Sequence, residues 1–91
     1  MNSSFAVIGL GKFGFHVAKG LPQQGLTVIA VDQNEEQVRE INEYVQDAIV
    51  LDSTDIRALR EAGIGSVDVA VVSIGENIEA SILTVMALKE L

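Results

Sequence analysis

Several residue types are absent or scarce in this sequence of 91 residues, which has no cysteine, no tryptophan, one proline and one histidine. Without cysteine there is no disulfide framework, no thiolate zinc site and no thiol nucleophile. The one imidazole, on His16, argues against a metal site built on histidine. These absences exclude disulfide scaffolds and thiol chemistry and leave no residues for the common structural zinc sites.

Basic side chains are also scarce, since 6 Lys and Arg stand against 13 Asp and Glu, for a formal net charge of -7. A chain without a basic stripe is poorly suited to nucleic acid, whose binding depends on phosphate contacts. No apolar run approaches the roughly 18 residues that span a bilayer, so we expect no direct membrane insertion. Residues 1–4 lack the charged start of a secretory signal, which favours a cytoplasmic location.

Hydrophobic residues make up 48% of the chain, which predicts a folded protein, and the length fits one small domain over residues 1–91. Four continuous apolar runs, each ending at a small or acidic residue, are typical of parallel strands covered on both faces. They cover residues 5–8, 27–31, 48–51 and 67–74.

The intervening segments have helical spacing. The first helix is predicted over residues 11–24, with a weak last turn at Gly20 and Pro22. The other three predicted helices have capping residues at their starts: Asn34 for a helix that includes Val45, Ser53 or Thr54 for one closed by Gly63, and Asn77 for the last, whose apolar residues occupy more than one face.

Strands alternating with helices predict an α/β fold, a Rossmann-like doubly wound parallel sheet of about four strands in the order 3-2-1-4, with helices on both faces. Complete folds of this kind continue into a fifth and a sixth strand. The fourth strand would otherwise be a hydrophobic edge. We therefore expect either a shortened domain or a partner that covers this edge.

Gly9, Gly11 and Gly14 form a G-x-G-x-x-G motif between the first predicted strand and the first helix. The first glycine permits a tight turn, the second lets the backbone approach a phosphate, and the third allows close packing of helix on strand. The start of the helix then offers free N–H groups to an anion. We interpret the motif as a phosphate-binding turn; the alternative is a merely tight junction.

Two charged residues complete this predicted site. Asp32 ends the second strand, where a carboxylate accepts hydrogen bonds from ribose hydroxyls and repels a 2′-phosphate, which favours NAD or an adenine nucleotide over NADP. Lys12 is the one cation in the turn and can reach a terminal phosphate. The alternatives are a strand-end turn residue for Asp32 and a solvated side chain for Lys12.

Two loops lie at the predicted carboxyl edge of the sheet, where such folds bind ligands, and their residues are candidates for either helix capping or ligand contact. His16 has no partner in a recognisable triad spacing, so we interpret it as a packed or partly exposed helix residue. Phe13 and Phe15 are interpreted as helix packing, although Phe13 could cover part of a ligand. The two loops comprise Asp52, Ser53 and Thr54, and Gly75, Glu76 and Asn77.

With these motifs the chain resembles the N-terminal lobe of the RCK domain, also called TrkA-N or KTN, most of all in soluble subunits of Ktr-type potassium transporters. The segments that carry the resemblance are F-A-V-I-G-L-G-K-F-G at 5–14, V-D-Q-N-E-E at 31–36, L-D-S-T-D at 51–55 and V-V-S-I-G-E-N-I-E-A-S at 71–81.

The resemblance implies a non-enzymatic cytoplasmic domain that binds ATP or ADP, or else NAD or NADH, and gates potassium flow. It implies dimers within a homo-oligomeric ring below a membrane potassium-translocating subunit, and a lobe that is incomplete at its C-terminus. It places Lys12 at terminal phosphate, and the other implied contacts are Asp32 with Gln33 and Asn34 at the adenosine, Asp52 and Ser53 on the adenine side, and Ile74, Gly75 and Glu76 near ribose and phosphate.

Two other functions stay open from the residues themselves. One is the cofactor half of an NAD-dependent oxidoreductase, which would need a catalytic acid or base that this sequence does not reveal. The other is a structural oligomerisation module in which the glycine turn holds no ligand.

Overall fold

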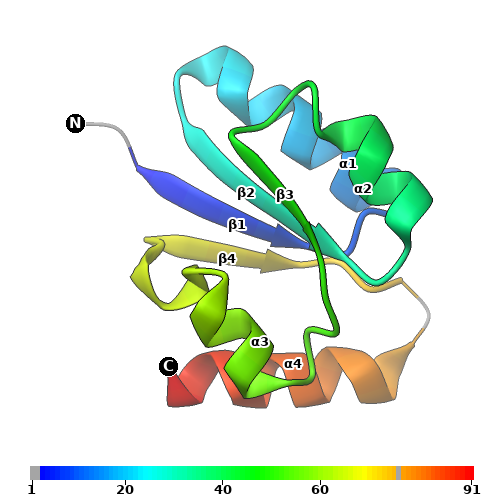
Figure 1. Ribbon diagram of the computed structural model, residues 1–91, viewed down its shortest axis with the longest axis vertical. Helices are drawn as coiled ribbons and strands as arrows, with labels where there is room; N and C mark the ends of the chain where they lie inside the picture. The colour runs from blue at the N-terminus through cyan, green and yellow to red at the C-terminus, as the bar shows by residue number, and fades with distance from the viewer. Residues whose placement is uncertain (1–2, 76) are drawn as a thin grey trace.

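The computed structural model describes residues 3–75 and 77–91, and it has the predicted α/β architecture (Figure 1). Helices cover both faces of a parallel sheet. Along the chain the elements are β1 (Ser4–Ile8), α1 (Lys12–Gly20), the 3₁₀ helix η1 (Leu21–Gln24), β2 (Thr27–Asp32), α2 (Glu35–Ile41), β3 (Asp47–Val50), α3 (Ile56–Glu61), the 3₁₀ helix η2 (Ile64–Ser66), β4 (Val69–Val72) and α4 (Ile78–Glu90).

The four strands lie in the order β3-β2-β1-β4, and all pairs are parallel, which confirms the predicted topology. In the centre, Phe5 of β1 is opposite Val28 of β2 and Val69 of β4. The carboxyl ends of the strands therefore meet at one edge of the sheet, together with the loops that follow them.

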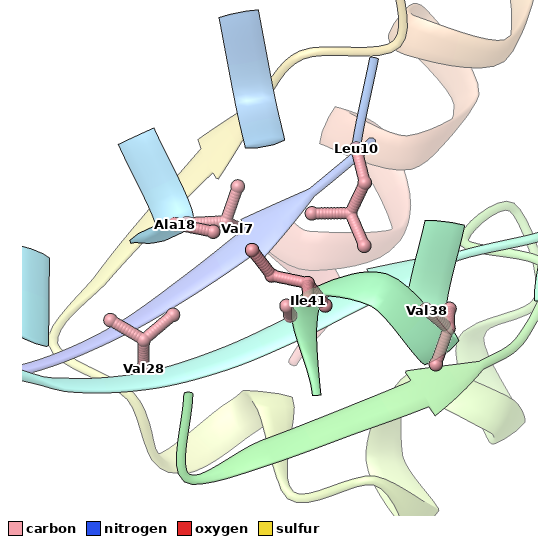
Figure 2. Close-up of a cluster of buried hydrophobic side chains, with 7 residues drawn as sticks. Val7, Leu10, Ala18, Val28, Val38 and Ile41 are labelled. Atoms are coloured by element: carbon pink, nitrogen blue, oxygen red, sulfur yellow. The ribbon is translucent and has the colours of Figure 1, made fainter. Parts of the chain in front are cut away.

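Alternating side chains of the central strands fill two separate cores. On the face covered by α1 and α2, Val7 and Val28 pack with Ala18 and Ile41, as Figure 2 shows. On the face covered by α3 and α4, a second cluster contains Ala6, Ile8, Val31, Leu59, Ile64 and Ala87. Because both faces of β1 and β2 are covered, residues 5–8 and 28–31 of these strands are all apolar, as expected for continuous apolar runs.

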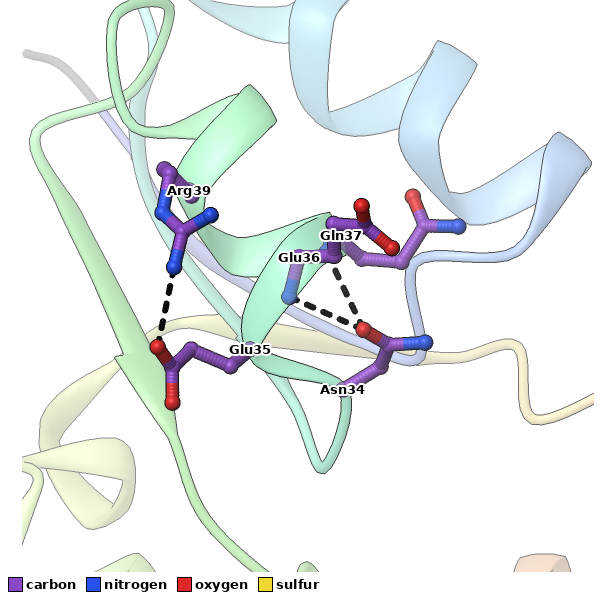
Figure 3. Close-up of polar contacts among 5 residues, drawn as sticks. All are labelled: Asn34, Glu35, Glu36, Gln37 and Arg39. Atoms are coloured by element: carbon purple, nitrogen blue, oxygen red, sulfur yellow. Dashed lines mark hydrogen bonds and ion pairs between the residues drawn. The ribbon is translucent and has the colours of Figure 1, made fainter.

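Asn34 caps α2 as predicted: its Oδ1 accepts from the backbone N of Glu36 at 2.9 Å and of Gln37 at 3.4 Å (Figure 3). The same figure shows an ion pair of 2.9 Å between Arg39 and Glu35, both largely exposed, so its contribution to stability is small. Asn77 caps α4 by accepting from the backbone N of Ala80 at 2.9 Å.

The cap predicted for α3 is wrong. Asp55 occupies that position, and its Oδ1 accepts from the backbone N of Arg57 at 3.0 Å. Ser53 and Thr54 are engaged elsewhere, because Thr54 bonds back to Asp52 and the Ser53 hydroxyl bonds to a distant helix. Both contacts draw these side chains away from the start of α3.

Three other elements differ from prediction by more than one residue at an end. The helix predicted over 11–24 ends at Gly20 and continues as η1, consistent with the weak turn expected at Gly20 and Pro22. α2 ends at Ile41, so Val45 lies beyond the helix but still packs against the first core. β4 is shorter than the predicted 67–74 because its pairing with β1 covers only 69–72.

The outer face of α4 is apolar, as the sequence indicated. Thr84 and Ala87 are buried, whereas Ile78, Ile82 and Met86 are 71%, 55% and 61% exposed. At the neighbouring end of the sheet, β4 pairs on one side only. None of the described helices is long and apolar enough to cross a membrane.

Candidate functional site

A cleft of about 520 Å³ opens at the carboxyl edge of the sheet, where the loops after all four strands converge. Ten of the residues singled out from the sequence as binding residues line it: Gly9, Gly11, Lys12, Phe13, Asp32, Gln33, Asn34, Ser53, Ile74 and Gly75. Two further residues of the loops 52–54 and 75–77, Thr54 and Asn77, also line the cleft.

The three motif glycines have different structural roles. Gly9 has φ +101°, and a Cβ there would overlap the carbonyl of Ser73, so neither conformation nor space permits a side chain. Gly14 is buried, and a Cβ on it would overlap the carbonyl oxygen of Gly9, so this glycine allows α1 to approach β1. Gly11 has open space where its Cβ would be and lines the cleft. This division matches the mechanical reading of the motif.

The first turn of α1 faces the cleft without a side-chain cap. Its N-cap is Gly11, which has no side chain to offer, and no acidic residue stands in the first turn. The leading N–H groups of a helix have no partner within the helix, and the positive end of the dipole adds to their attraction for an anion. Lys12 and Phe13, the first helical residues, both line the cleft. The arrangement is suited to a phosphate group.

Asp32 joins the glycine turn to the start of α2. Its Oδ2 accepts a hydrogen bond from the backbone N of Leu10 at 2.6 Å, and its Oδ1 accepts one from the backbone N of Asn34 at 2.8 Å. The side chain is half-buried and lines the cleft. Each carboxylate oxygen keeps a further lone pair, so Asp32 can still accept bonds from two hydroxyl groups.

The charges of the cleft differ from those of the whole chain. Among the described residues that line it, Lys12 is the one basic side chain and Asp32 the one carboxylate. The chain as a whole has a net charge of -7. The cleft therefore repels an anion less than the rest of the surface does. Its positive charge lies beside the uncapped start of α1.

Asp52 does not line the cleft, unlike its neighbour Ser53. Its Oδ1 accepts from the Thr54 hydroxyl at 2.7 Å and from the Thr54 backbone N at 2.9 Å, which turns the carboxylate along its own loop. The hydroxyl bond, followed by the backbone bond, lowers the pKa of Asp52 below its ordinary value. The structure therefore gives Asp52 a role in shaping the loop rather than a place in the cleft.

The loop after β4 completes the opposite wall. Ser73 and Ile74 line the cleft, and so does Gly75, which has φ +73°. Glu76, another predicted contact, lies outside the described residues. Sequence reasoning missed Ser73 because the predicted strand over 67–74 included it, whereas β4 ends at Val72 and leaves Ser73 at the start of the loop. It also missed Ile8, Leu10, Gln37, Leu51 and Ala80, which line the cleft through their position next to the turns and caps.

The aromatic residues and the histidine of α1 fall in different places. His16, predicted to be a packed or partly exposed helix residue, is exposed on α1 and does not line the cleft. Phe15 packs against the first core, as predicted. Phe13 is 67% exposed at the rim of the cleft, so the packing predicted for it is wrong; that it covers part of a ligand stays a prediction.

No group of three or more His, Asp or Glu side chains suited to a metal ion occurs in ranges 3–75 and 77–91. The described lining of the cleft contains backbone amides and one ammonium, which can bind an anion, and one carboxylate with neighbouring amides and hydroxyls, which can bind polar groups of a ligand.

Comparison with known proteins gives a consistent result. The family profile of the TrkA-N domain matches residues 5–91. The chain is 46% identical over its full length to Ktr system potassium uptake protein C of Bacillus subtilis (strain 168), and 44% identical over 99% of its length to protein A of the same system and organism. Protein A of Vibrio alginolyticus is 40% identical over 98% of the chain.

The chain spans only 41%, 40% and 40% of the lengths of these three relatives. Among solved structures, the NAD(P)-binding domain of an exopolyphosphatase-related protein from Archaeoglobus fulgidus superposes with a TM-score of 0.83 at 26% identity, over 94% of this chain and 64% of that one. The matched fold is thus one that binds dinucleotides in that protein.

Proposed function

Because the chain belongs to the TrkA-N family, we propose that its cleft binds an adenine nucleotide, ATP or ADP, and that occupancy of the cleft regulates potassium uptake. The observation that carries the proposal is the meeting of the uncapped α1 start, Lys12 and Asp32 around one cleft. The names of the three Ktr relatives support the link to potassium uptake.

The order of the strands supports one direction for the ligand. The turn after β1, with Gly11 and Lys12, would hold phosphate, and Asp32 at the end of β2 would hold the ribose hydroxyls. Continuing in the same direction, the loop after β3 would lie beside the base. Ser53 and Thr54 are the polar residues there that line the cleft.

NAD or NADH is the second candidate ligand, and the NAD(P)-binding neighbour supports it. The two candidates share the adenosine part, so both use Asp32 in the same way. The rest of the ligand differs: the terminal phosphates of ATP or ADP require positive charge, whereas NAD requires room for a second nucleoside. Lys12 and the uncapped α1 start favour the terminal phosphates of ATP or ADP.

A regulatory role follows if the ligand binds one conformation of an assembly better than another, because a ligand shifts an equilibrium only by its differential affinity. We propose a homo-oligomeric assembly, with dimers in a ring, attached to a membrane potassium-translocating subunit on its cytoplasmic side. The exposed apolar face of α4 and the open side of β4 support an assembly that covers them.

We propose no catalysis for this cleft. Hydride transfer by an oxidoreductase would require an acid or base beside the reacting atom, and the titratable side chains of the described lining are Asp32 and Lys12, both assigned to ligand binding. Oxidation of NADH by a small keto acid, or reduction of NAD by a small hydroxy acid, would contradict this.

The test is native mass spectrometry of the purified chain followed by calorimetric titration with ATP, ADP, NADH and NADPH. We expect ATP or ADP to bind, and NADPH to bind less tightly than NADH because Asp32 repels its 2′-phosphate. If none of the four binds at millimolar concentration, the cleft is not a nucleotide site, and the structural oligomerisation module is the better reading.

A further inference from the structure

Two hydroxyl groups meet directly behind the lining of the cleft. Oγ of Ser53, in the loop after β3, lies 2.7 Å from Oγ1 of Thr84, in the middle of α4, and either atom can be the donor. Thr84 is completely buried and Ser53 is only 9% exposed. Ser53 lines the cleft and Thr84 does not. The bond therefore connects a surface that a ligand would touch to a helix behind it.

Apolar contacts hold α4 against the sheet independently of this bond. Ala87 and Leu88 of this helix already pack in the second core with Ile8 and Leu59. A buried pair of hydroxyls adds little net stability compared with apolar groups of the same shape, although removing one partner alone leaves the other unsatisfied. This buried bond thus fits positioning of the Ser53 side chain better than stabilisation of the fold.

We propose that Thr84 is a positioning residue, which fixes the Ser53 hydroxyl so that it contacts the base of the nucleotide in the cleft. The inference rests on the proposed function only for the presence of a base; it is the same for ATP, ADP and NADH, which share adenosine. Ser53 would be the contact, and Thr84 acts through it.

The choice of two hydroxyls has a chemical consequence. A hydroxyl has one donor proton and two acceptor lone pairs, so the bond between the pair can run in either direction. When Thr84 donates, the proton of Ser53 is free for a ring nitrogen of the base. When Ser53 donates, both of its lone pairs stay free, and one of them can accept from an exocyclic amine. In both cases the Ser53 oxygen stays in the same place, and the base determines whether the hydroxyl donates or accepts.

The decisive variant is Thr84→Val, which keeps the shape and removes the hydroxyl. Two probes separate positioning from general damage: ADP, which has the base, and ribose 5-phosphate, which has the sugar and a phosphate but no base. We expect Thr84→Val to weaken ADP binding about threefold to tenfold, the value of one hydrogen bond, and to leave ribose 5-phosphate unchanged. Thr84→Ser should restore ADP binding.

Three controls sharpen the experiment. Thr27→Val makes the same substitution at the start of β2, at the opposite edge of the sheet, and should leave the affinity for both probes unchanged. Ser53→Ala should weaken ADP binding as Thr84→Val does. In the Ser53→Ala background, Thr84→Val should have no further effect, because a residue that acts through Ser53 has nothing left to position.

Several results would overturn the inference. Equal weakening of both probes by Thr84→Val would make Thr84 a purely structural residue, and a full additional loss in the Ser53→Ala background would mean that it does not act through Ser53. A wild-type chain that binds neither probe would refute the proposed function itself. Positioning is then decided without ligand from the NMR couplings that report χ1 of Ser53: one rotamer in the wild-type chain and averaging in Thr84→Val support it, and averaging in both refutes it.

Discussion

Asp32 and Leu10 are joined by a hydrogen bond of 2.6 Å from the backbone N of Leu10 to Oδ2 of the carboxylate. This bond connects the end of β2 to the glycine turn after β1. The other carboxylate oxygen accepts from the backbone N of Asn34, the residue that caps α2. A single side chain thus organises the two turns that form the proposed phosphate and ribose sites.

This arrangement predicts that Asp32→Asn harms both the fold and binding. An amide has one acceptor oxygen and a donating NH₂ group, so one of the two backbone N–H groups would face a donor. We expect a loss of about 1 to 3 kcal/mol in the free energy of unfolding, measured by urea denaturation, because charged acceptors make the stronger bonds. Nucleotide affinity should fall as well, by calorimetry.

Asp47→Asn is the matched control for that variant. Asp47 is exposed at the start of β3, away from the cleft, and loses the same charge. Its substitution should leave the unfolding free energy and the affinity nearly unchanged. Equal effects of the two variants would mean that net charge, and not the two backbone bonds, determines the result.

The glycine motif predicts that stability and binding can be separated. Gly11→Ala places a methyl group in open space of the cleft at a φ of -69°, so we expect stability within about 0.5 kcal/mol of wild type and a large loss of nucleotide affinity. Gly9→Ala meets both a φ of +101° and the Ser73 carbonyl, so the fold itself should be strongly destabilised.

Gly25→Ala controls for the conformation alone. It has φ +82° but nothing within 4 Å of the added Cβ, so it should cost only about 1 kcal/mol, the strain of a left-handed non-glycine residue. Thermal unfolding measures all three variants. A Gly9→Ala protein as stable as Gly25→Ala would show that the overlap with Ser73 is relieved without cost.

The sequence was informative about the sheet because local patterns determine it. Continuous apolar runs such as 5–8 and 27–31 are required by strands with both faces covered, and Gly9 and Asp32 stand at their carboxyl ends. The parallel pairing followed from the alternation with helices, and the order of the strands was taken from the usual doubly wound topology. These features need no knowledge of distant contacts.

Other features depend on contacts between remote residues and could not be predicted. Ser53 does not cap α3 because its hydroxyl bonds to Thr84, 31 positions later in the sequence. Asp52 and Ser53 are neighbours in the sequence, yet only Ser53 lines the cleft. The exclusion of a side chain at Gly9 comes from Ser73, which approaches only when β4 pairs with β1.

The cation beside the glycine turn predicts a graded effect of charge. Lys12→Gln should weaken binding most for ATP, less for ADP and least for adenosine, because an ammonium attracts terminal phosphates as a point charge. The differences should shrink as salt rises, since the side chain is exposed. Calorimetric titrations at low and high ionic strength measure both trends.

Lys19→Gln is the control for Lys12→Gln. Lys19 is also exposed on α1, but its Nζ lies 4.8 Å from the centre of the Tyr44 ring and away from the cleft. It should have no graded effect. If Lys12→Gln weakened ATP, ADP and adenosine equally, Lys12 would not contact phosphate.

The apolar face of α4 predicts an effect on association without an effect on the fold. Ile82 and Met86 are 55% and 61% exposed, one helical turn apart. Ile82→Glu should therefore leave thermal unfolding of the dissociated chain unchanged while reducing self-association in light scattering coupled to size-exclusion chromatography. Glu79→Gln, on the same helix, is the control and should not dissociate the assembly. An unchanged mass for Ile82→Glu would place the contact between copies elsewhere.

Asp52 predicts a contribution to stability on the acid side. Its pKa is lowered from the ordinary value of 3.8, first by the Thr54 hydroxyl and then by the Thr54 backbone N. A group with a lowered folded pKa stabilises the fold above its unfolded pKa and loses this contribution as pH falls through the folded value. The contribution should therefore be complete at neutral pH and lost below about pH 4.

The carboxyl ¹³C shift of Asp52, followed by NMR against pH, measures this directly. Thr54→Val removes the hydroxyl that contributes most, so the pKa of Asp52 should rise toward its ordinary value, and the acid limb of the stability profile should become less steep. Because the carboxylate is exposed, the change in stability will be small compared with the shift in titration. A titration of Asp52 that Thr54→Val leaves unmoved would assign the lowered pKa to the Thr54 backbone bond and the Gln33 side chain.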